Sequence, residues 1–280
     1  MINYNLHQHS LFSDGKEPAR KYAEKAVELG FSTIGFSEHS PLPFQNTFSL
    51  KEEKITEYID TIEQLKTEYA GRLNIYRALE MDFIPGMSED FNFWRKEVQA
   101  DYLIGSIHLV KPDFGEELWF TDGPDYRTYD EGLNLFFEGN IQKAVAPFYH
   151  QTNRMIESQQ FEILGHFDKI KMHNRSRFFT EDEKWYRRLV DETLALVKLK
   201  NLIVEVNTRG LYKKRSDSLF PDNYALQRIK ELNIPVIISS DAHLSEELKM
   251  LFDFAENRLK ALGFKEVMSF EKGEWNAVKI

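Results

Sequence analysis

The sequence predicts an α/β fold, a closed or nearly closed parallel barrel formed by a single domain over residues 1–280. Seven short apolar runs alternate with segments of helical period, which is the pattern of βαβ units around a parallel sheet. Runs such as "LIVEV" and "PVIIS" are continuously apolar, as expected of strands buried on both faces. No Gly-, Ser- or Pro-rich linker divides the chain, and barrels of this kind often run to about 250 residues as one unit.

The predicted strands are residues 2–6, 33–36, 74–83, 102–107, 162–164, 202–206 and 235–239. Apolar residues recur with helical period in the segments between them, at residues 18–29, 50–69, 182–199 and 224–232. An open doubly wound sheet is the alternative architecture. No G-x-G-x-x-G motif follows the first run, so a dinucleotide site is not expected.

The connection over residues 109–160 is much longer than the others. It begins with the polar, turn-rich stretch "KPDFGEELWFTDGPDY" and continues with a predicted helix over residues 128–159. Long connections with structure of their own are often functional, so part of this segment is expected near a site.

Composition narrows the function further. A net charge of −9 argues against broad binding to nucleic acids or acidic membranes, which needs a basic face. The chain has no cysteine, so thiolate metal sites, disulfides and a cysteine nucleophile are excluded. The first residues, "MINYNLHQHS", do not read as a signal peptide, and no apolar run reaches the ~18 residues of a membrane helix. A cytoplasmic protein is expected, and the oligomeric state is left open.

Histidines and acidic residues gather where the predicted strands end. Six of the eight histidines occupy such positions, and the carboxyl ends of barrel strands converge on one face. The strand-end residues are His7, His9, Glu38, His39, Glu80, Asp82, His108, His166, Asp168, Asp241 and His243. Side chains more than 230 positions apart are therefore expected to meet in one pocket.

Imidazole and carboxylate groups in this number indicate a metal site. Residues i and i+2 of an extended chain share a face, so His7 and His9 can point the same way, as can Asp241 and His243. Both groups are ligands for Zn, Fe or Mn, and the supply exceeds the needs of one four-coordinate ion. Two or three divalent ions are expected. A single strand-end Asp is often only a helix cap, and a lone H-x-H motif is a weak signal, but those readings would have to hold at six strand ends.

The ordered motifs resemble a known family. H-x-H at residues 7–9, S-E-H at 37–39, Glu80, G-S-I-H at 105–108, G-H-x-D at 165–168 and S-D-A-H at 240–243 are similar to the PHP (polymerase and histidinol phosphatase) superfamily. "GSIH", "GHFD", "EVNT" and "SSDAH" look most like its histidinol-phosphatase branch. The resemblance implies a distorted (β/α)7, TIM-like barrel with a trinuclear metal centre.

The resemblance also assigns ligands, motif by motif. A first metal would be held by His7, His9, Glu80 and Asp241. Glu80 would bridge to a second metal, completed by His108 and His166. A third metal would be held by His39 and His243. Many relatives carry a further His after the H-x-H motif, where this chain has "FSDG", so Asp14 is the expected substitute.

The implied activity is that of a metal-dependent phosphomonoesterase, first of all a histidinol-phosphate phosphatase. It would convert L-histidinol phosphate and water to L-histidinol and phosphate by attack of a metal-bridging hydroxide. Asp241 and His243 are the expected catalytic residues, which would orient the hydroxide or shuttle the proton. The alternatives are another PHP phosphoesterase, such as a phosphotyrosine phosphatase or a nuclease, a hydrolase of C–N bonds and a non-catalytic metal-binding module.

A phosphate dianion in an acidic protein also needs cationic partners. Arginine suits this role because its fork binds phosphate oxygens in pairs. Arg209 directly follows a strand end, and Arg154 lies in the helical segment before the fifth strand. Asn207, with Glu205 and Asp168, is a candidate for contact with a cationic amine of the substrate.

Overall fold

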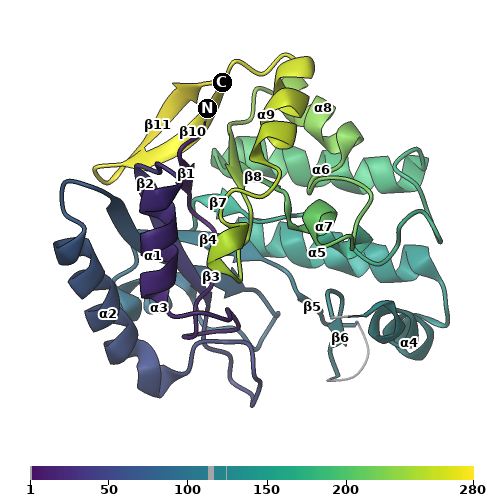
Figure 1. Cartoon of the computed structure of the whole chain (residues 1–280). Coiled ribbons are helices and arrows are strands. Elements are labelled where there is room, and N and C mark those ends of the chain that lie inside the picture. The colour runs from purple at the N-terminus through teal and green to yellow at the C-terminus, as the bar shows by residue number, and fades with distance from the viewer. Residues whose placement is uncertain (1, 113–116, 124) are drawn as a thin grey trace.

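The predicted barrel is confirmed in the computed structural model, which describes residues 2–112, 117–123 and 125–280. Its seven parallel strands follow the chain in the order β1-β2-β3-β4-β7-β8-β9 and form a nearly closed barrel (Figure 1). The strands are β1 (Tyr4–Asn5), β2 (Thr33–His39), β3 (Asn74–Asp82), β4 (Tyr102–Ser106), β7 (Ile163–Leu164), β8 (Ile203–Asn207) and β9 (Val236–Ser239). Every predicted strand therefore exists, with ends that differ by a few residues.

The barrel closes beyond the ends of its first and last strands. Gln8 and Ala242 form an isolated parallel bridge. The backbone N–H of His9 donates to the carbonyl of Ala242 at 2.8 Å, and that of Ala242 donates to the carbonyl of His7 at 3.2 Å. Closure thus places the H-x-H motif directly beside the S-D-A-H motif.

Helices surround the barrel (Figure 1). Those that match predicted segments are α1 (Ala19–Glu28), α2 (Ile55–Glu68), α6 (Lys184–Lys200) and α8 (Asn223–Glu231). The structure adds α3 (Phe91–Val98), α9 (Phe252–Ala261) and the short α7 (Arg209–Tyr212), none of which the sequence pattern indicated. Three 3₁₀ turns, η1 (Glu52–Lys54), η2 (Lys169–Lys171) and η3 (Ser245–Glu247), complete the loops. No helix of the described chain is both long enough and apolar enough to cross a bilayer.

The prediction of one helix over residues 128–159 is wrong, because two helices occupy this region. α4 (Tyr126–Phe137) ends where Glu138 and Gly139 adopt positive φ angles of 54° and 73°. The side chain of Asn140 then accepts hydrogen bonds from the backbone of Gln142 and Lys143 and starts α5 (Ile141–Ser158). Before α4, the strands β5 (Leu109–Val110) and β6 (Trp119–Phe120) pair antiparallel. Residues 113–116 and 124 of the turn-rich stretch lie outside the described residues.

An antiparallel hairpin, β10 (Glu266–Glu271) and β11 (Glu274–Lys279), lies beside the N-terminus at the end of the barrel away from β5, β6 and α4 (Figure 1). Its Phe270 and Trp275 rings pack against Tyr102, with centroids 5.6 and 5.8 Å away. The Tyr102 hydroxyl donates to the carbonyl of Leu6. Gly35 makes room for this ring, because a Cβ there would lie 1.9 Å from the Tyr102 hydroxyl oxygen. This end of the barrel is filled, which leaves the opposite end for a site.

Candidate metal centre

Nine side chains meet at the carboxyl ends of the barrel strands. They form four overlapping groups, and within each group one nitrogen or oxygen atom per residue lies within 4.8 Å of the others. The groups are His7, Glu80 and His166; His7, His9 and Asp241; His39, Glu80 and His108; and His9, Asp14, His39 and His243. The structure therefore brings together all nine residues that the sequence singled out as candidate ligands.

Glu80, near the end of β3, lies at the middle of this cluster. Its Oε2 is 3.2 Å from His7 Nε2 and 3.2 Å from His39 Nδ1. Its Oε1 accepts a hydrogen bond from the Ser106 hydroxyl at 2.7 Å and lies 2.8 Å from His166 Nε2. Burial opposes the charge of this carboxylate, but the neighbouring histidines, His7 foremost, hold its pKa well below the usual range. An ionised carboxylate with imidazoles on both of its oxygens is arranged as a bridging ligand would be.

Several buried polar atoms of the cluster lack hydrogen-bond partners in the described part of the chain, as metal ligands would. Buried nitrogen and oxygen atoms are nearly always hydrogen-bonded, so unpartnered ones need an explanation. Seven buried atoms of the nine candidates have no hydrogen-bond partner among the described residues. They are Nε2 of His7, His9 and His108, Nδ1 of His39 and His166, Oε2 of Glu80 and Oδ1 of Asp14. Histidine and carboxylate donors left unpartnered together in one buried cluster fit divalent metal ions.

Two further carboxylates orient histidines of the cluster. Glu205 Oε1 lies 2.5 Å from His7 Nδ1, and Asp82 Oδ1 lies 2.8 Å from His108 Nδ1. Each pair assigns the proton to Nδ1 and leaves Nε2 for the cluster. Burial disfavours the charged imidazole of His108, but Asp82 outweighs it and raises the pKa to about 9. Asp82 was noted in the sequence without a role; its position two residues after Glu80 on one strand was the available signal.

Asp14, the residue of the "FSDG" stretch that was expected to replace a histidine of the relatives, lies within the cluster. Its Oδ2 is 3.0 Å from His243 Nε2, and its Oδ1 is 3.7 Å from His39 Nε2. Buried Glu38 holds the segment that carries Asp14, because it accepts hydrogen bonds from the Ser10 backbone and hydroxyl and from the Ser13 hydroxyl. The S-E-H motif thus supplies both a candidate ligand, His39, and the clamp for the loop that carries another.

The cluster opens into a cavity of about 510 Å³. Its lining includes five of the nine candidates, Asp14, His39, His108, Asp241 and His243. Its cationic wall contains Lys169, Arg209, Lys213 and Arg215, and its aromatic wall contains Phe48 and Phe120, whose rings stack with centroids 5.8 Å apart. A cavity of this size and mixed lining suits a small anionic ligand with an apolar part.

Arg209 lies on this cavity wall, as its place after a strand end predicted. One of its Nη atoms donates to the carbonyl of Asp241 at 2.7 Å and to the Tyr212 hydroxyl at 3.2 Å. Its other Nη atom has no hydrogen bond to any described residue, which leaves it for a ligand.

The structure moves two predicted substrate-binding residues away from the cavity. Arg154 is exposed on α5 and lines a separate surface pocket with Lys111 and His150, because it lies on the outer face of that helix. Asn207 is fully buried beneath the cluster, where its amide nitrogen lies 3.1 Å from Glu205 and 3.4 Å from Asp241. Unlike Arg209, neither residue is among those that line the cavity.

The sequence missed Lys169 and Asp122. Both line the cavity, and the Lys169 ammonium lies 2.7 Å from Asp122 Oδ2. Lys169 directly follows the G-H-F-D motif, which could have drawn attention to it. Asp122 lies in the long connection, where only its nearness in space to His108 marks it out.

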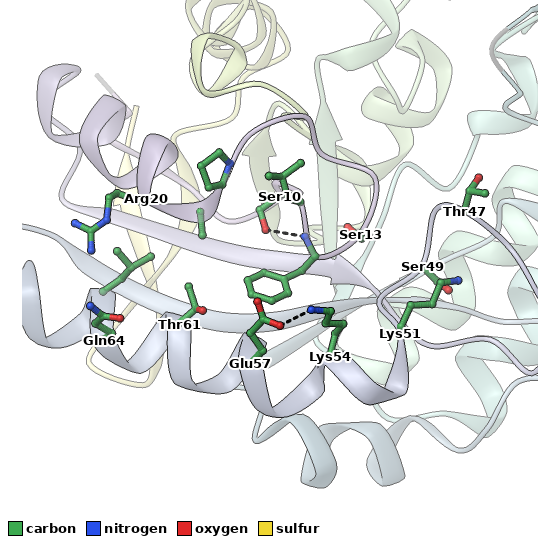
Figure 2. A pocket seen from close by; sticks show the side chains of 15 residues that line it. Ser10, Ser13, Arg20, Thr47, Ser49, Lys51, Lys54, Glu57, Thr61 and Gln64 are labelled. Atoms are coloured by element: carbon green, nitrogen blue, oxygen red, sulfur yellow. Dashed lines mark hydrogen bonds and ion pairs between the residues drawn. The ribbon is translucent and has the colours of Figure 1, made fainter.

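A second pocket, of about 590 Å³, lies between α1 and α2 (Figure 2). It is lined on one side by Ser10, Leu11, Phe12 and Ser13, and on the other by residues of α2 and the turn before it. None of the nine candidate ligands is among the residues that line it, and Lys54 is paired there with Glu57. The chemistry therefore resides in the cavity of the histidine cluster.

Comparison with known proteins agrees with this geometry. The family model described as "PHP domain" matches residues 5–209. The "Probable histidinol-phosphatase" of Deinococcus radiodurans is 27% identical over 250 residues, which cover 89% of this chain and 88% of that protein. The "Histidinol-phosphatase" of Bacillus subtilis is 26% identical over 248 residues, covering 84% and 90%. The crystal structure of histidinol phosphate phosphatase from Lactococcus lactis, complexed with Zn, L-histidinol and phosphate, is 22% identical, covers 98% of each chain and has a TM-score of 0.69.

Proposed function

Since the chain belongs to the PHP domain family, we propose that it is a metal-dependent phosphomonoesterase that hydrolyses L-histidinol phosphate to L-histidinol and phosphate. The observation that carries the proposal is the buried cluster of unpartnered imidazole and carboxylate atoms at the floor of a cavity with a cationic wall. The substrate follows from the relatives named histidinol-phosphatase, which match nearly the whole chain. The stacked Phe48 and Phe120 rings offer an apolar wall for the imidazole ring of such a substrate.

Two or three divalent ions, Zn, Fe or Mn, would be held by the nine residues of the cluster, two of whose groups share Glu80. When bound, such ions lower the pKa of water and screen the charge of phosphoryl oxygens. Cavity side chains outside the cluster, such as Arg209, then bind and orient the substrate, while Asp241 and His243 of the cluster are proposed to orient the attacking water and to relay its proton.

Asp241 is proposed to orient the attacking water through a hydrogen bond. Its Oδ1 faces His9 Nε2 at 3.4 Å, while its Oδ2 lies 4.0 Å from Arg209 Nε. Burial opposes ionisation of Asp241, but His7 and Arg209 outweigh it and hold the pKa well below the usual range, so the group is ionised and can accept a hydrogen bond that orients the attacking water. In the reaction a P–O bond to water forms and the ester P–O bond breaks, and the proton that water loses balances the one that the leaving alkoxide gains.

His243 is proposed to relay that proton. Burial, with the charge of Arg209, lowers its pKa, so the ring is neutral near pH 7 and able to accept a proton. It lies on the cavity wall, 3.0 Å from Asp14 through Nε2 and 3.0 Å from the carbonyl of Asp241 through Nδ1. Arg209 binds the phosphoryl oxygens from the same side.

A panel of phosphate esters tests the proposal. Purified protein of measured metal content is assayed, with Mn or Zn supplied, on L-histidinol phosphate, phosphotyrosine, p-nitrophenyl phosphate, a p-nitrophenyl phosphodiester and a short oligonucleotide. We expect the highest kcat/KM on L-histidinol phosphate. Absence of turnover on every monoester would overturn the phosphatase proposal, and preference for the diester or the oligonucleotide would favour a nuclease. Replacement of Arg209 by Ala should mainly raise KM, and an unchanged KM would remove this residue from the phosphate site.

A further inference from the structure

The Lys169–Asp122 pair is an ion pair inside the cavity rather than on its rim. The side chain of Lys169 is only 6% exposed and that of Asp122 is 13% exposed, with the ammonium 2.7 Å from Oδ2. Stability alone does not explain such a pair, because the cost of removing both charges from water offsets most of their attraction. A pair that adds little to the fold and faces a ligand cavity is a candidate for ligand recognition.

Both partners are anchored to candidate metal ligands by the backbone. Thr121, next to Asp122, donates from its N–H and from its hydroxyl to the carbonyl of His108, each at 3.0 Å. The N–H of Lys169 donates to the carbonyl of His166 at 2.8 Å. Asp122 Oδ2 lies 3.9 Å from His108 Nε2. The pair is thus fixed at the side of the metal cluster, where a phosphoryl group would lie.

In the described part of the chain, one carboxylate oxygen of Asp122 is free to bind a ligand. Its Oδ1 is buried and has no hydrogen-bond partner among the described residues, while Oδ2 contacts Lys169. A buried, unpartnered carboxylate oxygen is costly unless a donor reaches it. The carboxylates first considered for a cationic amine, Glu205 and Asp168, are buried and are not among the residues that line the cavity.

We propose that Lys169 and Asp122 recognise the two charges of an aminoalkyl phosphate, Lys169 binding the phosphoryl oxygens and Asp122 Oδ1 binding the ammonium group. L-Histidinol phosphate carries an ammonium group two carbons from its ester oxygen, so both charges can be met by groups that are themselves in contact. Phe120, two residues before Asp122, lines the same cavity and meets the apolar end of the substrate. This inference rests on the proposed function and identifies the residues that make the enzyme prefer amine-bearing phosphomonoesters.

The test compares L-histidinol phosphate with its desamino analogue, 3-(imidazol-4-yl)propyl phosphate, in four proteins: the wild type, Asp122→Asn, Lys169→Met and, as a control in the same connection, Asp130→Asn. A charged hydrogen bond corresponds to about 10- to 100-fold in binding, so the wild type and the control should prefer the amine-bearing substrate by about that factor in kcat/KM. Asp122→Asn should bring the preference to within about 3-fold. Lys169→Met should lower kcat/KM for both substrates by a similar factor and keep the preference.

Product binding gives a second readout that does not depend on turnover. In calorimetric titrations of the metal-loaded proteins, Asp122→Asn should weaken the binding of L-histidinol but not of inorganic phosphate, and Lys169→Met should do the reverse. Metal content is measured for each variant. An undiminished preference in Asp122→Asn, or loss of a metal ion from it, would overturn the inference. A wild type that hydrolyses neither substrate would instead overturn the proposed function.

Discussion

At the scale of single residues, Asp82 and Glu205 act on the cluster through histidines rather than by direct contact. Asp82 raises the pKa of His108 to about 9 despite its burial, so in the metal-free protein this ring carries two protons near pH 7. Its folded pKa lies above its unfolded value of 6.5, so its contribution to stability is full below about pH 6.5 and is lost as the pH rises through about 9. A metal ion at Nε2 must displace one of these protons.

We therefore predict that metal uptake strengthens between about pH 6.5 and 9. Titration of metal-free protein with Mn or Zn against a competing chelator measures the affinity at each pH. Asp82→Asn should weaken uptake by about 10- to 100-fold and make its pH dependence shallower, because the ring loses both its orienting partner and the cause of its raised pKa. Asp130→Asn, outside the cavity, should behave as the wild type. An equally steep pH dependence in Asp82→Asn would contradict this role.

His9 offers the most direct test of the cluster. It is fully buried, and its Nε2 faces both Glu80 and Asp241 at 3.4 Å. His9→Ala should remove metal and activity together, lowering kcat by more than the about 100-fold typical of losing an outer partner of a ligand. Metal analysis and kinetics measure the two effects. His150→Asn, on the exposed face of α5, is the control and should retain both. Full activity in His9→Ala would remove this residue from the metal site.

Eight of the nine candidate ligands could be predicted from the sequence because they lie at or just beyond strand ends, which are visible as the limits of apolar runs, whereas Asp14 came only from the family resemblance. His7, His9, Asp241 and His243 belong to this group. Lys169 and Asp122 could not be predicted in the same way. Their position depends on the path of a turn and of a long connection, which local hydrophobic pattern does not encode.

At the scale of elements, the connection between β4 and β7 shapes the cavity. β6 supplies Phe120, and Asp122 lies two residues further along the chain. β6 is held by the packing of Trp119 against Tyr129 and Phe137 of α4, with ring centroids 4.9 and 5.3 Å apart. Gly132 allows this contact, because a Cβ there would lie 2.1 Å from Trp119 Cδ1. The position of Asp122 therefore depends on a helix far from the metal cluster in sequence.

Gly132→Ala should disturb the site from a distance. Trp119 is buried among aromatic rings and cannot move aside cheaply, so we expect a loss of about 1–3 kcal/mol in unfolding free energy together with a raised KM. Denaturant unfolding and steady-state kinetics measure the two effects. Glu131→Ala, the exposed neighbour on α4, should stay within about 0.5 kcal/mol of the wild type and keep its KM. Equal stability of the two variants would contradict this prediction, because it would show that α4 can move away from Trp119 of β6 at no cost.

The split of the predicted 128–159 helix also belongs to this scale. Residues on both sides of Gly139 keep a helical period, so apolar spacing alone continues across the break. The positive φ angles of Glu138 and Gly139 and the capping side chain of Asn140 end one helix and start another. The "EGN" triplet was the available signal, since Gly favours helix C-termini and Asn favours N-caps.

At the scale of the whole molecule, the cluster joins the segments that follow the first and the last strand of the barrel. His7 and His9 follow the first strand, and Asp241 and His243 follow the last, so metal ions would tie together elements that otherwise meet through the Gln8–Ala242 bridge. Ligands that bind only the folded state stabilise it, by about 2.7 kcal/mol at a hundred times the dissociation constant.

Removal of metal should therefore lower the melting temperature. For a chain of this size we expect a decrease of about 5–10 °C after treatment with a chelator, restored by added Mn or Zn. Differential scanning calorimetry measures the change. His9→Ala should respond much less to the same treatment. The metal content is measured before and after treatment. If the metal is removed and the melting temperature does not change, the ions do not link the first and last strands.

The sequence by itself determined the seven strands, the order of the barrel and, with the family resemblance for Asp14, the set of nine candidate ligands. Strand periodicity and the short motifs at strand ends are local, and the convergence of parallel strand ends is a general property of the fold. Only the tertiary structure decided which polar groups line the cavity. It placed Asn207 beneath the cluster and Arg154 on another face, and it brought Lys169 into contact with Asp122. Such contacts depend on how loops pack over the barrel, and packing is a property of the whole molecule.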